Sequence, residues 1–313
     1  MIAVTKDFFK KNVFSLLYVS IYQGGKNMHL EKPVTVKTYE ALHKRIYFDQ
    51  KQKKIYYAFR MGYEGEWEFG QILEEKDIPH ALVYDSELEN GITTQLDFVV
   101  ITSHRIYLLD IKNHSGIYHY EKGDFFKNGE KSNNPLTQLN RAYDVLDILL
   151  RRKNIKLPIE KKVIFINPTF TLYGNEPDFP IILRSQLDDY LAKIKLQASE
   201  INDYHHKIAA YIESCKVNRT HIDTKISYTY ESMAKGIWCD NCHSDKMQDR
   251  HKYFSCMNCQ QFELKSDIVT KSAREFYLLF PNEKLTSSKL RDWCGNRVSR
   301  KLTGKVLTKN QCK

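Results

Sequence analysis

Two Cys-x-x-Cys pairs constrain the local fold of this chain more than any other pattern. Cys239 and Cys242 form the first pair, Cys256 and Cys259 form the second, and 13 residues separate the pairs. Each pair makes a tight turn that directs two thiolates at one ion, so two pairs complete the tetrahedral site that Zn²⁺ prefers. Four thiolates leave no open position for a substrate. The sequence therefore predicts a structural zinc ribbon over residues 236–262.

The other histidines and cysteines add alternatives. His243 and His251 lie between the two pairs and could replace a cysteine as ligand. Of the seven cysteines, Cys215, Cys294 and Cys312 are scattered, and we expect them to be free thiols. Cysteines used for metal instead of disulfides indicate a reducing compartment, so we expect a cytoplasmic protein.

The first 30 residues are interpreted as a leader. Their apolar run, Val13–Tyr22, is too short to span a bilayer, and we expect no membrane partner. Residues 23–27, just before Met28, could be encoded by a purine-rich stretch that resembles a ribosome-binding site. Our hypothesis is that translation starts at Met28 and that residues 1–27 are not translated; native protein beginning at Met1 would contradict it.

Two apolar runs in the middle of the chain predict a β-hairpin. Phe98–Ile101 and Ile106–Lys112 flank four residues typical of a tight turn. A turn at the centre of those four residues places Asp97 opposite Asp110, and opposed residues share one face of the sheet. Lys112 shares that face because strand side chains alternate. The pattern predicts that these two aspartates and the lysine converge at the open end of the hairpin.

Adjacent carboxylates repel one another unless a cation neutralises them. Hard oxygen ligands favour Mg²⁺ or Mn²⁺. Such a site polarises a phosphodiester, lowers the pKa of a bound water and stabilises the charge that develops on the phosphate. The alternative is structural: Asp97 ends a turn, and Asp110 and Lys112 form an edge-strand salt bridge. The pattern alone leaves both interpretations open.

The surrounding segments predict an α/β fold with a mixed sheet. Residues 38–60 are expected to form a helix that Gly62 and Gly65 interrupt, and residues 66–74 a short amphipathic helix. Leu136–Arg152 has the pattern of a longer amphipathic helix. The order of elements from Gly65 is helix, about three strands, helix and strand, which is typical of a sheet flanked by helices. Further strands are expected at 83–84, 163–166 and 181–183, and further helices at 186–195 and 200–215.

Four motifs together resemble the nuclease-related domain, a branch of the PD-(D/E)xK nuclease superfamily. In that family a strand pair ends in an acidic residue, an aliphatic residue, Lys-Asn and then Gly, as in Asp110–Gly116. The resemblance covers residues 62–172. The motifs occur in the family's order: Gly62–Glu66, Gln95–Gly116, Asn134–Leu139 and Phe165–Pro168.

This resemblance implies a restriction-endonuclease-like fold and a nuclease that hydrolyses DNA phosphodiesters with Mg²⁺ or Mn²⁺. It implies that Asp97 and Asp110 bind the metal. Lys112 would orient or deprotonate the attacking water, or stabilise the transition state. Glu66 would contribute from the first helix, and Gln138 would act as a positioning residue from the later one.

This sequence departs from the superfamily pattern at two positions. Leu96 stands where the superfamily has its proline, and Asp110 stands where a glutamate is more usual. Glu68 competes with Glu66 for the role on the first helix, because the two point to different helix faces. The alternative function is a non-catalytic nucleic-acid-binding or adaptor protein on a degenerate nuclease fold.

The C-terminal segment is basic. Residues 265–313 hold 12 Lys and Arg against 4 Asp and Glu, in a chain of net charge +10. Three short helices are expected there, at 272–280, 286–294 and 298–309, with Thr286 or Ser287 as a cap. Such helices suggest a helix-turn-helix module that contacts nucleic acid, and a protein-docking or structural tail is equally compatible. The residues expected to contact nucleic acid are Arg291, Arg297, Arg300, Lys301 and Lys305.

The expected organisation combines these segments. A leader (1–30) and a helical N-terminal extension (31–61) precede a nuclease-related core (62–175). A helical extension (176–235), the zinc ribbon (236–262) and the basic helical module (268–313) follow. The sequence leaves open DNA against RNA, the mode of cleavage and the oligomeric state.

Overall fold

The computed structural model describes residues 30–311 apart from 92, 175–177, 218–223 and 225. The hypothesis about Met28 and the expectation for Cys312 lie outside the described residues. The chain divides into two compact units. Ala58–Thr220 makes up most of one unit, here called the core unit. Val34–Tyr57 and His221–Lys313 belong to the other, here called the ribbon unit.

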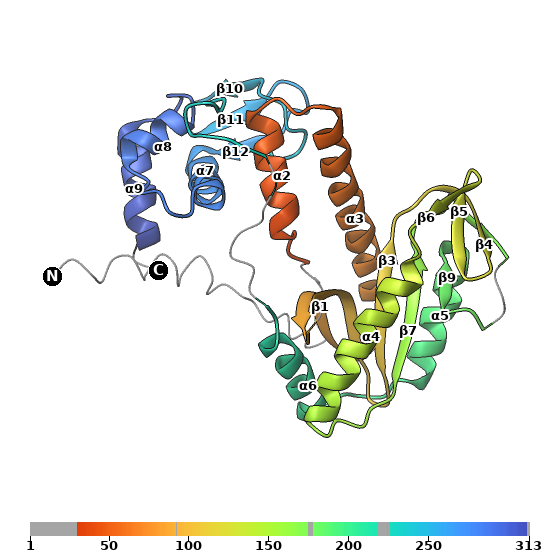
Figure 1. The fold of residues 1–313 in the computed structure, drawn as a ribbon. Coiled ribbons are helices and arrows are strands. Elements are labelled where there is room, and N and C mark those ends of the chain that lie inside the picture. The colour runs from red at the N-terminus through yellow and green to blue at the C-terminus, as the bar shows by residue number, and fades with distance from the viewer. Residues whose placement is uncertain (1–29, 92, 175–177, 218–223, 225, 312–313) are drawn as a thin grey trace. The chain divides into compact units, whose positions relative to one another are not determined.

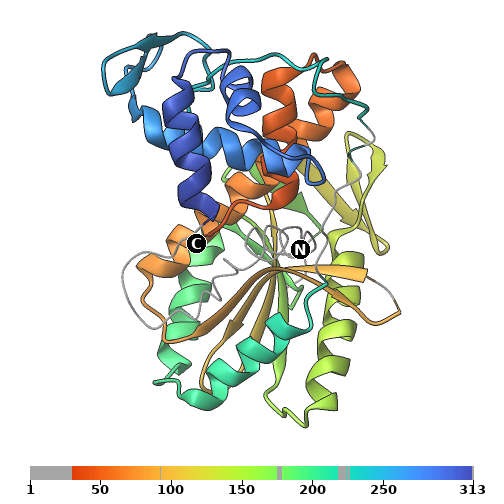
Figure 2. The ribbon, with the colours of Figure 1, turned by 90° about the vertical axis from the view of Figure 1, so that its left-hand side faces the viewer.

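A five-stranded mixed sheet forms the centre of the core unit, as predicted (Figure 1). Its strand order is β1-β2-β3-β7-β9. The first three strands pair antiparallel with one another, and β7 and β9 continue the sheet parallel to β3. The sheet is twisted (Figure 2). Its strands are β1 (Ala81–Glu89), β2 (Thr93–Ile101), β3 (Ile106–Lys112), β7 (Ile159–Phe165) and β9 (Ile181–Leu183).

Helices cover both faces of this sheet because its inner strands are apolar on both sides. On β3, Ile106 and Leu108 pack in one apolar cluster, while Tyr107 and Leu109 pack in another. The first cluster contains residues of α4 (Pro135–Arg152) and α6 (Asp203–Ser214), and the second contains residues of α3 (Gln50–Glu75) and α5 (Arg184–Gln197). A four-stranded sheet adds to the first face, in the order β6 (Glu130–Ser132), β5 (Asp124–Lys127), β4 (Gly116–Glu121) and β8 (Phe170–Tyr173).

The predicted helix at 136–152 is confirmed as α4. Asn134 caps it by accepting the N–H of Leu136 at 2.9 Å, and Pro135 occupies its first turn. Leu139, Leu146 and other apolar residues of its buried stripe pack on the sheet. This helix holds one wall of the site described below.

The expected interruption by two glycines is wrong. The helix α3 runs through Gly62 and Gly65 without a break. The break lies earlier instead, between α2 (Val34–Arg45) and α3, where Asp49 accepts the N–H of Gln52 at 2.7 Å and opens the second helix. Tertiary packing explains Gly65, as a Cβ there would lie 2.7 Å from the Cβ of Asn113. A glycine lowers helix propensity but permits this close approach.

In its described residues, the ribbon unit contains a small antiparallel sheet, the helix α2, the start of α3 and the C-terminal helices (Figure 1). The sheet contains β10 (Met247–Asp249), β11 (Tyr253–Cys256) and β12 (Phe262–Leu264). The helix α2 shares one apolar cluster with the three C-terminal helices. Those helices are α7 (Lys265–Leu279), α8 (Ser287–Trp293) and α9 (Arg300–Gln311).

A buried arginine anchors α2 within this unit. The Arg45 side chain is 1% exposed, and its Nη2 lies 2.6 Å from Glu275 Oε1. Its guanidinium stacks 3.6 Å from the ring centroid of Trp293 and 4.5 Å from that of Trp238. Within the described residues, no helix is both long enough and apolar enough to cross a membrane.

Candidate active site and metal centre

The hairpin between β2 and β3 has the predicted register. Phe98 pairs with Leu109, and Ile101 pairs with Ile106, so Asp97 lies opposite Asp110. The N–H of Ile111 donates to Asp97 Oδ2 at 2.9 Å, which fixes this carboxylate against the neighbouring strand. Both aspartates are buried, at 6% and 5% exposure.

Lys112 lies between an aspartate and a glutamine. Its Nζ lies 2.8 Å from Asp110 Oδ2, and it donates to Gln138 Oε1 at 3.3 Å. The two strand residues share one face, and Gln138 comes from the second turn of α4. The structure thus brings together the hairpin residues and the α4 residue that the sequence singled out.

Glu66 reaches the site from α3. It is buried, and its Oε2 accepts a hydrogen bond of 2.7 Å from the hydroxyl of Tyr84. Glu68 lies elsewhere, with Oε1 3.8 Å from Arg184 Nε. Of the two glutamates, Glu66 is the one whose charge acts on Asp97 and Lys112.

Asn113 attaches this part of α3 to the end of β3, and Asn167 holds Asn113 in place. Asn113 donates to the carbonyl oxygen of Met61 at 2.9 Å and accepts from Asn167 Nδ2 at 3.0 Å. Gly65 allows the helix to approach Asn113 closely. Glu66 is therefore positioned by backbone packing as well as by its own hydrogen bond.

The sequence analysis missed two residues beside the site. Tyr84 was expected only as part of a short strand, and Asp85, the residue after it, was not considered. Asp85 adopts a left-handed φ of 46° within β1, at the position opposite Asp97 in the register. Its Oδ1 accepts from Gln95 Nε2 at 2.8 Å. Pairing of β1 with β2 could have located it, but only once the full length of β1 was known.

The site buries three carboxyl groups beside a single lysine. Burial raises the pKa of Asp97 well above its ordinary value, and the charges of Asp110 and Glu66 raise it further. Burial also raises the pKa of Asp110, against the lowering effect of Lys112. Burial raises the pKa of Glu66 to about 7, although the hydrogen bond from Tyr84 opposes this.

This donor set fits a divalent cation held through two carboxylates. Buried like charges are costly, and hard oxygen donors favour Mg²⁺ or Mn²⁺. The oxygens of Glu66, Asp97 and Asp110 do not gather within 4.8 Å of one another, a convergence that only the cysteines reach in the described part of the chain. Asp97 and Asp110, which lie on neighbouring strands, are the residues suited to a shared ion.

The four predicted cysteines converge on one point. One Sγ from each of Cys239, Cys242, Cys256 and Cys259 lies within 4.8 Å of the other three. Sγ–Sγ distances are 3.6 Å between Cys239 and Cys259 and 3.5 Å between Cys242 and Cys256. Four thiolates at these separations can hold a tetrahedral ion such as Zn²⁺.

The two Cys-x-x-Cys turns have the same backbone conformation. In each, the residue after the second cysteine, His243 or Gln260, has a left-handed φ, of 58° and 60° respectively. The N–H of that residue donates to the carbonyl of the first cysteine at 2.9 Å. His243 thus serves the turn and is not part of the four-ligand cluster. The apolar core of the ribbon unit contains Phe254, while Tyr253 is exposed.

The basic residues of the tail divide into two sets. Arg297 is half-buried; it donates to the carbonyl of Met247 and lies 5.0 Å from the ring centroid of Phe254. Arg291 donates to the carbonyl of Val298 at 3.2 Å. Three exposed residues, Arg300, Lys301 and Lys305, lie on α9.

The predicted cap of α8 is Thr286, which accepts the N–H of Lys289 at 3.2 Å.

Comparison with known proteins gives one finding for the core unit. Residues 61–166 match the family model of the nuclease-related domain. This span contains Glu66, the hairpin and Gln138, and it confirms the resemblance seen in the motifs. No curated protein and no solved structure matched the chain.

Proposed function

We propose that the nuclease-related domain of this chain hydrolyses phosphodiester bonds in nucleic acid, with DNA as its substrate. The observation that carries the proposal is the buried pair Asp97 and Asp110 on neighbouring strands, with Lys112 against Asp110. The match to the nuclease-related domain supports it, because these three residues are within the matched span 61–166.

Asp97 and Asp110 would hold Mg²⁺ or Mn²⁺. When bound, the ion polarises the scissile phosphate and lowers the pKa of a water molecule. Asp97 keeps its orientation through the N–H of Ile111, which leaves its second oxygen for a ligand. Metal held in this way also offsets the repulsion between the two aspartates.

Lys112 would stabilise the transition state as a positive charge. Its ammonium is held from two sides, by Asp110 and by the Gln138 amide. An ammonium at the end of a strand, beside the carboxylates, can face the negative charge that grows on the phosphate during attack. Gln138 would set the direction of the lysine side chain.

Glu66 would accept a proton near the reacting water. A carboxylate whose pKa lies about 7 is balanced between its two protonation states at neutral pH, which suits a general base. The hydroxyl of Tyr84 holds one of its oxygens in place. In this arrangement the charge-stabilising and proton-accepting roles belong to different residues.

The second candidate is a nucleic-acid-binding or adaptor protein without catalysis. Two observations favour it: Lys112 already neutralises Asp110, and the oxygens of the three acids do not gather as a ligand cluster in the described residues. Metal binding separates the candidates. Calorimetric titration of Mn²⁺ should show binding that Asp110→Ala removes, whereas the adaptor predicts no such binding.

The direct test is cleavage. Labelled linear, circular and single-stranded DNA, and a matched RNA, are incubated with purified protein and Mg²⁺, Mn²⁺ or a chelator. We expect metal-dependent cutting that falls at least about 100-fold in Asp110→Ala. Asp144→Ala, an exposed acid on α4, is the matched control and should cut normally. Zinc-loaded, folded protein that cuts none of these substrates would refute the proposal.

A further inference from the structure

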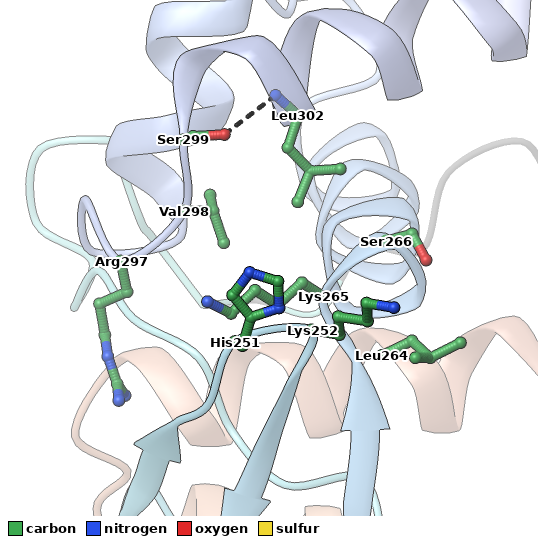
Figure 3. Close-up of a pocket in the computed structure, with 9 residues that line it drawn as sticks. All are labelled: His251, Lys252, Leu264, Lys265, Ser266, Arg297, Val298, Ser299 and Leu302. Carbon is green, nitrogen blue, oxygen red and sulfur yellow. Dashed lines mark hydrogen bonds between the residues drawn. The ribbon is translucent and has the colours of Figure 1, made fainter.

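A cavity of about 450 Å³ opens in the ribbon unit, and none of the residues assigned to catalysis lines it. In Figure 3, His251 lies between Arg297 on the left and Leu264 and Ser266 on the right. Three segments separated in sequence form the walls. They are the β10–β11 turn with His251 and Lys252, the β12–α7 junction at residues 264–266, and the start of α9 with residues 297–299 and Leu302.

The walls carry more positive than negative charge. Lys252 is exposed, and among the described residues its side chain has no hydrogen bond or ion pair. Lys265 Nζ lies 2.5 Å from Asp249 Oδ1, which neutralises that lysine. Arg297 donates to the carbonyl of Met247 and forms no ion pair with an acid in the described part of the chain. Lys252 and Arg297 thus leave an excess of cations facing the cavity.

One buried ring fixes two of these cations. Phe254 is fully buried, and its ring centroid lies 5.2 Å from Lys265 Nζ and 5.0 Å from the Arg297 guanidinium carbon. Cation–ring contacts of this kind restrict long side chains. Arg297 and Lys265 therefore have preset positions at the cavity wall, beside the exposed Lys252.

The first turn of α7 adds donors to the same wall. Its N-cap, Leu264, supplies no side-chain cap, and the N–H of Lys265 donates to the carbonyl of Lys252 at 3.1 Å. The next amides of a helix start have no acceptor within the helix, so they favour an anion. One acid is close by: Asp267 accepts from the Ser266 hydroxyl at 3.1 Å.

An exposed apolar strip continues from the cavity along the ribbon sheet. Tyr253, Phe262 and Leu264 are 37%, 61% and 52% exposed. Tyr253 pairs with Leu264 across β11 and β12, and the Tyr253 and Phe262 rings meet edge-on with centroids 5.3 Å apart. Because Lys252 and Leu264 also line the cavity, the strip and the charged site form one continuous surface.

We propose that this surface binds single-stranded nucleic acid, with a backbone phosphate in the cavity and a base against the Tyr253–Phe262 pair. Cationic grooves beside exposed aromatic rings suit single strands, because an unpaired base exposes its flat face for stacking. A duplex keeps its bases stacked and presents only phosphates. The proposal rests on the proposed function in that nucleic acid is the ligand of the chain, and it specifies the strand form held outside the core unit.

The test measures binding without cleavage. Fluorescence anisotropy of a labelled short single strand, and of the matching duplex, is recorded with full-length zinc-loaded protein in buffer without Mg²⁺ or Mn²⁺. We expect tighter binding of the single strand. Phe262→Ala should weaken it about 5- to 100-fold, the usual range for loss of one base-stacking ring. Lys252→Ala should weaken it and reduce the salt slope by about 0.7, as for one lost phosphate contact.

Two exposed residues of the same unit serve as controls. Met257→Ala, on the ribbon, and Lys284→Ala, after α7, should leave affinity within about twofold. Zinc content and melting temperature of each variant confirm its fold. Single-strand binding that survives both Phe262→Ala and Lys252→Ala would overturn the proposal. A wild-type protein that binds neither the single strand nor the duplex would also overturn it and would favour a protein ligand for this surface.

Cleavage by the same variants separates this proposal from the proposed function. Phe262→Ala should raise KM for a single-stranded substrate and leave kcat unchanged, whereas Asp110→Ala should abolish kcat. Single-strand binding that depends on Lys252, in protein that never cleaves, would support the binding surface and refute only the nuclease. Cleavage with unaltered KM in Phe262→Ala would refute only the binding surface.

Discussion

The Asp97 carboxylate accepts a 2.9 Å hydrogen bond from the N–H of Ile111, the amide that lies between Asp110 and Lys112. This bond ties the middle of β2 to the end of β3 where the two acids face one another. The same side chain therefore supports the strand pairing and carries a buried charge. The hydrogen bond to Ile111 stabilises the fold, whereas burial of the carboxylate charge destabilises it. A substitution that keeps the acceptor and removes the charge separates the two effects.

Asp97→Asn should stabilise the protein when Mg²⁺ and Mn²⁺ are absent. Burial, and then Asp110 and Glu66, raise the pKa of Asp97. From about pH 4 up to that raised pKa, the folded chain holds a proton that the unfolded chain has lost, so stability falls as pH rises. Asparagine removes this dependence and keeps an acceptor for Ile111. We expect the melting temperature of the core to rise by about 2–8 °C at neutral pH.

Thermal unfolding of zinc-loaded protein, recorded between roughly pH 5.5 and pH 8, checks this prediction. The wild type should melt at lower temperature as pH rises, and the variant curve should be flatter. Added Mn²⁺ should raise the melting temperature of the wild type only. A variant that melts below the wild type at every pH would show that the carboxylate stabilises the hairpin more than its charge destabilises it.

Gly65→Ala should displace α3 and impair the site. The new Cβ would meet the Cβ of Asn113 at 2.7 Å, beside a rigid strand end, so the helix that carries Glu66 must shift. We expect a loss of about 1–3 kcal/mol in stability and a fall in kcat. Gly62→Ala is the matched control on the same helix, because nothing lies within 4 Å of its Cβ.

Gly62→Ala should gain about 0.5–1 kcal/mol from helix propensity and keep full activity. Urea unfolding and cleavage rates of the two variants give the comparison. Equal effects from both substitutions would mean that the close approach at Asn113 does not position Glu66.

Glu275→Ala should strongly destabilise the ribbon unit. It leaves the Arg45 guanidinium buried without its counter-charge, and such a loss typically costs about 3–5 kcal/mol. Arg274→Ala, the exposed neighbour on α7, should change stability by less than about 0.5 kcal/mol. Tryptophan fluorescence in a Trp67→Phe background follows this unit, since Trp238 and Trp293 both stack on Arg45.

The double variant Arg45→Met with Glu275→Leu removes both charges. We expect it to unfold at a higher urea concentration than Glu275→Ala alone, because no buried charge remains unpaired. An equally unstable double variant would assign the loss to packing against the tryptophans instead of to electrostatics.

Cys256→Ser should release the metal and unfold the ribbon. Cys239 and Cys256 are buried in the apolar cluster that also holds Phe276 and Trp293, so loss of the ion exposes this core. Structural zinc contributes about 10–16 kcal/mol of binding free energy in small zinc domains. Mass spectrometry of the native protein measures the zinc, and limited proteolysis reports unfolding. Cys215→Ser, which lies outside the cluster, should keep its zinc and its protease resistance.

The hairpin was predictable because its register follows from local geometry alone. A four-residue turn between two apolar runs determines which residues face one another, and Asp97 and Asp110 follow from that. The cysteine spacing is equally local. The course of α3 was not predictable, because Gly65 is selected by contact with Asn113, which lies 48 residues away in the chain.

The contact between Tyr84 and Glu66 depends on long-range packing in the same way. It requires the full length of β1 and the position of α3 on the sheet, and neither is encoded in a short window. The packing of α2 with the C-terminal helices could not be predicted from the sequence either. An amphipathic pattern predicts that one face of a helix is buried, but not which element packs against that face.

That shared apolar cluster has a consequence for how the protein is made. Val34–Tyr57 and the segment from His221 onward belong to one folding unit, and the whole of Ala58–Thr220 is synthesised between them. The early helix therefore leaves the ribosome long before the surface it packs against exists. The core unit can fold first. Until the C-terminal segment is made, the apolar side chains of Tyr39 and Leu42 on α2 remain exposed to solvent. During this interval of synthesis, the exposed apolar face of α2 is a binding site for a chaperone.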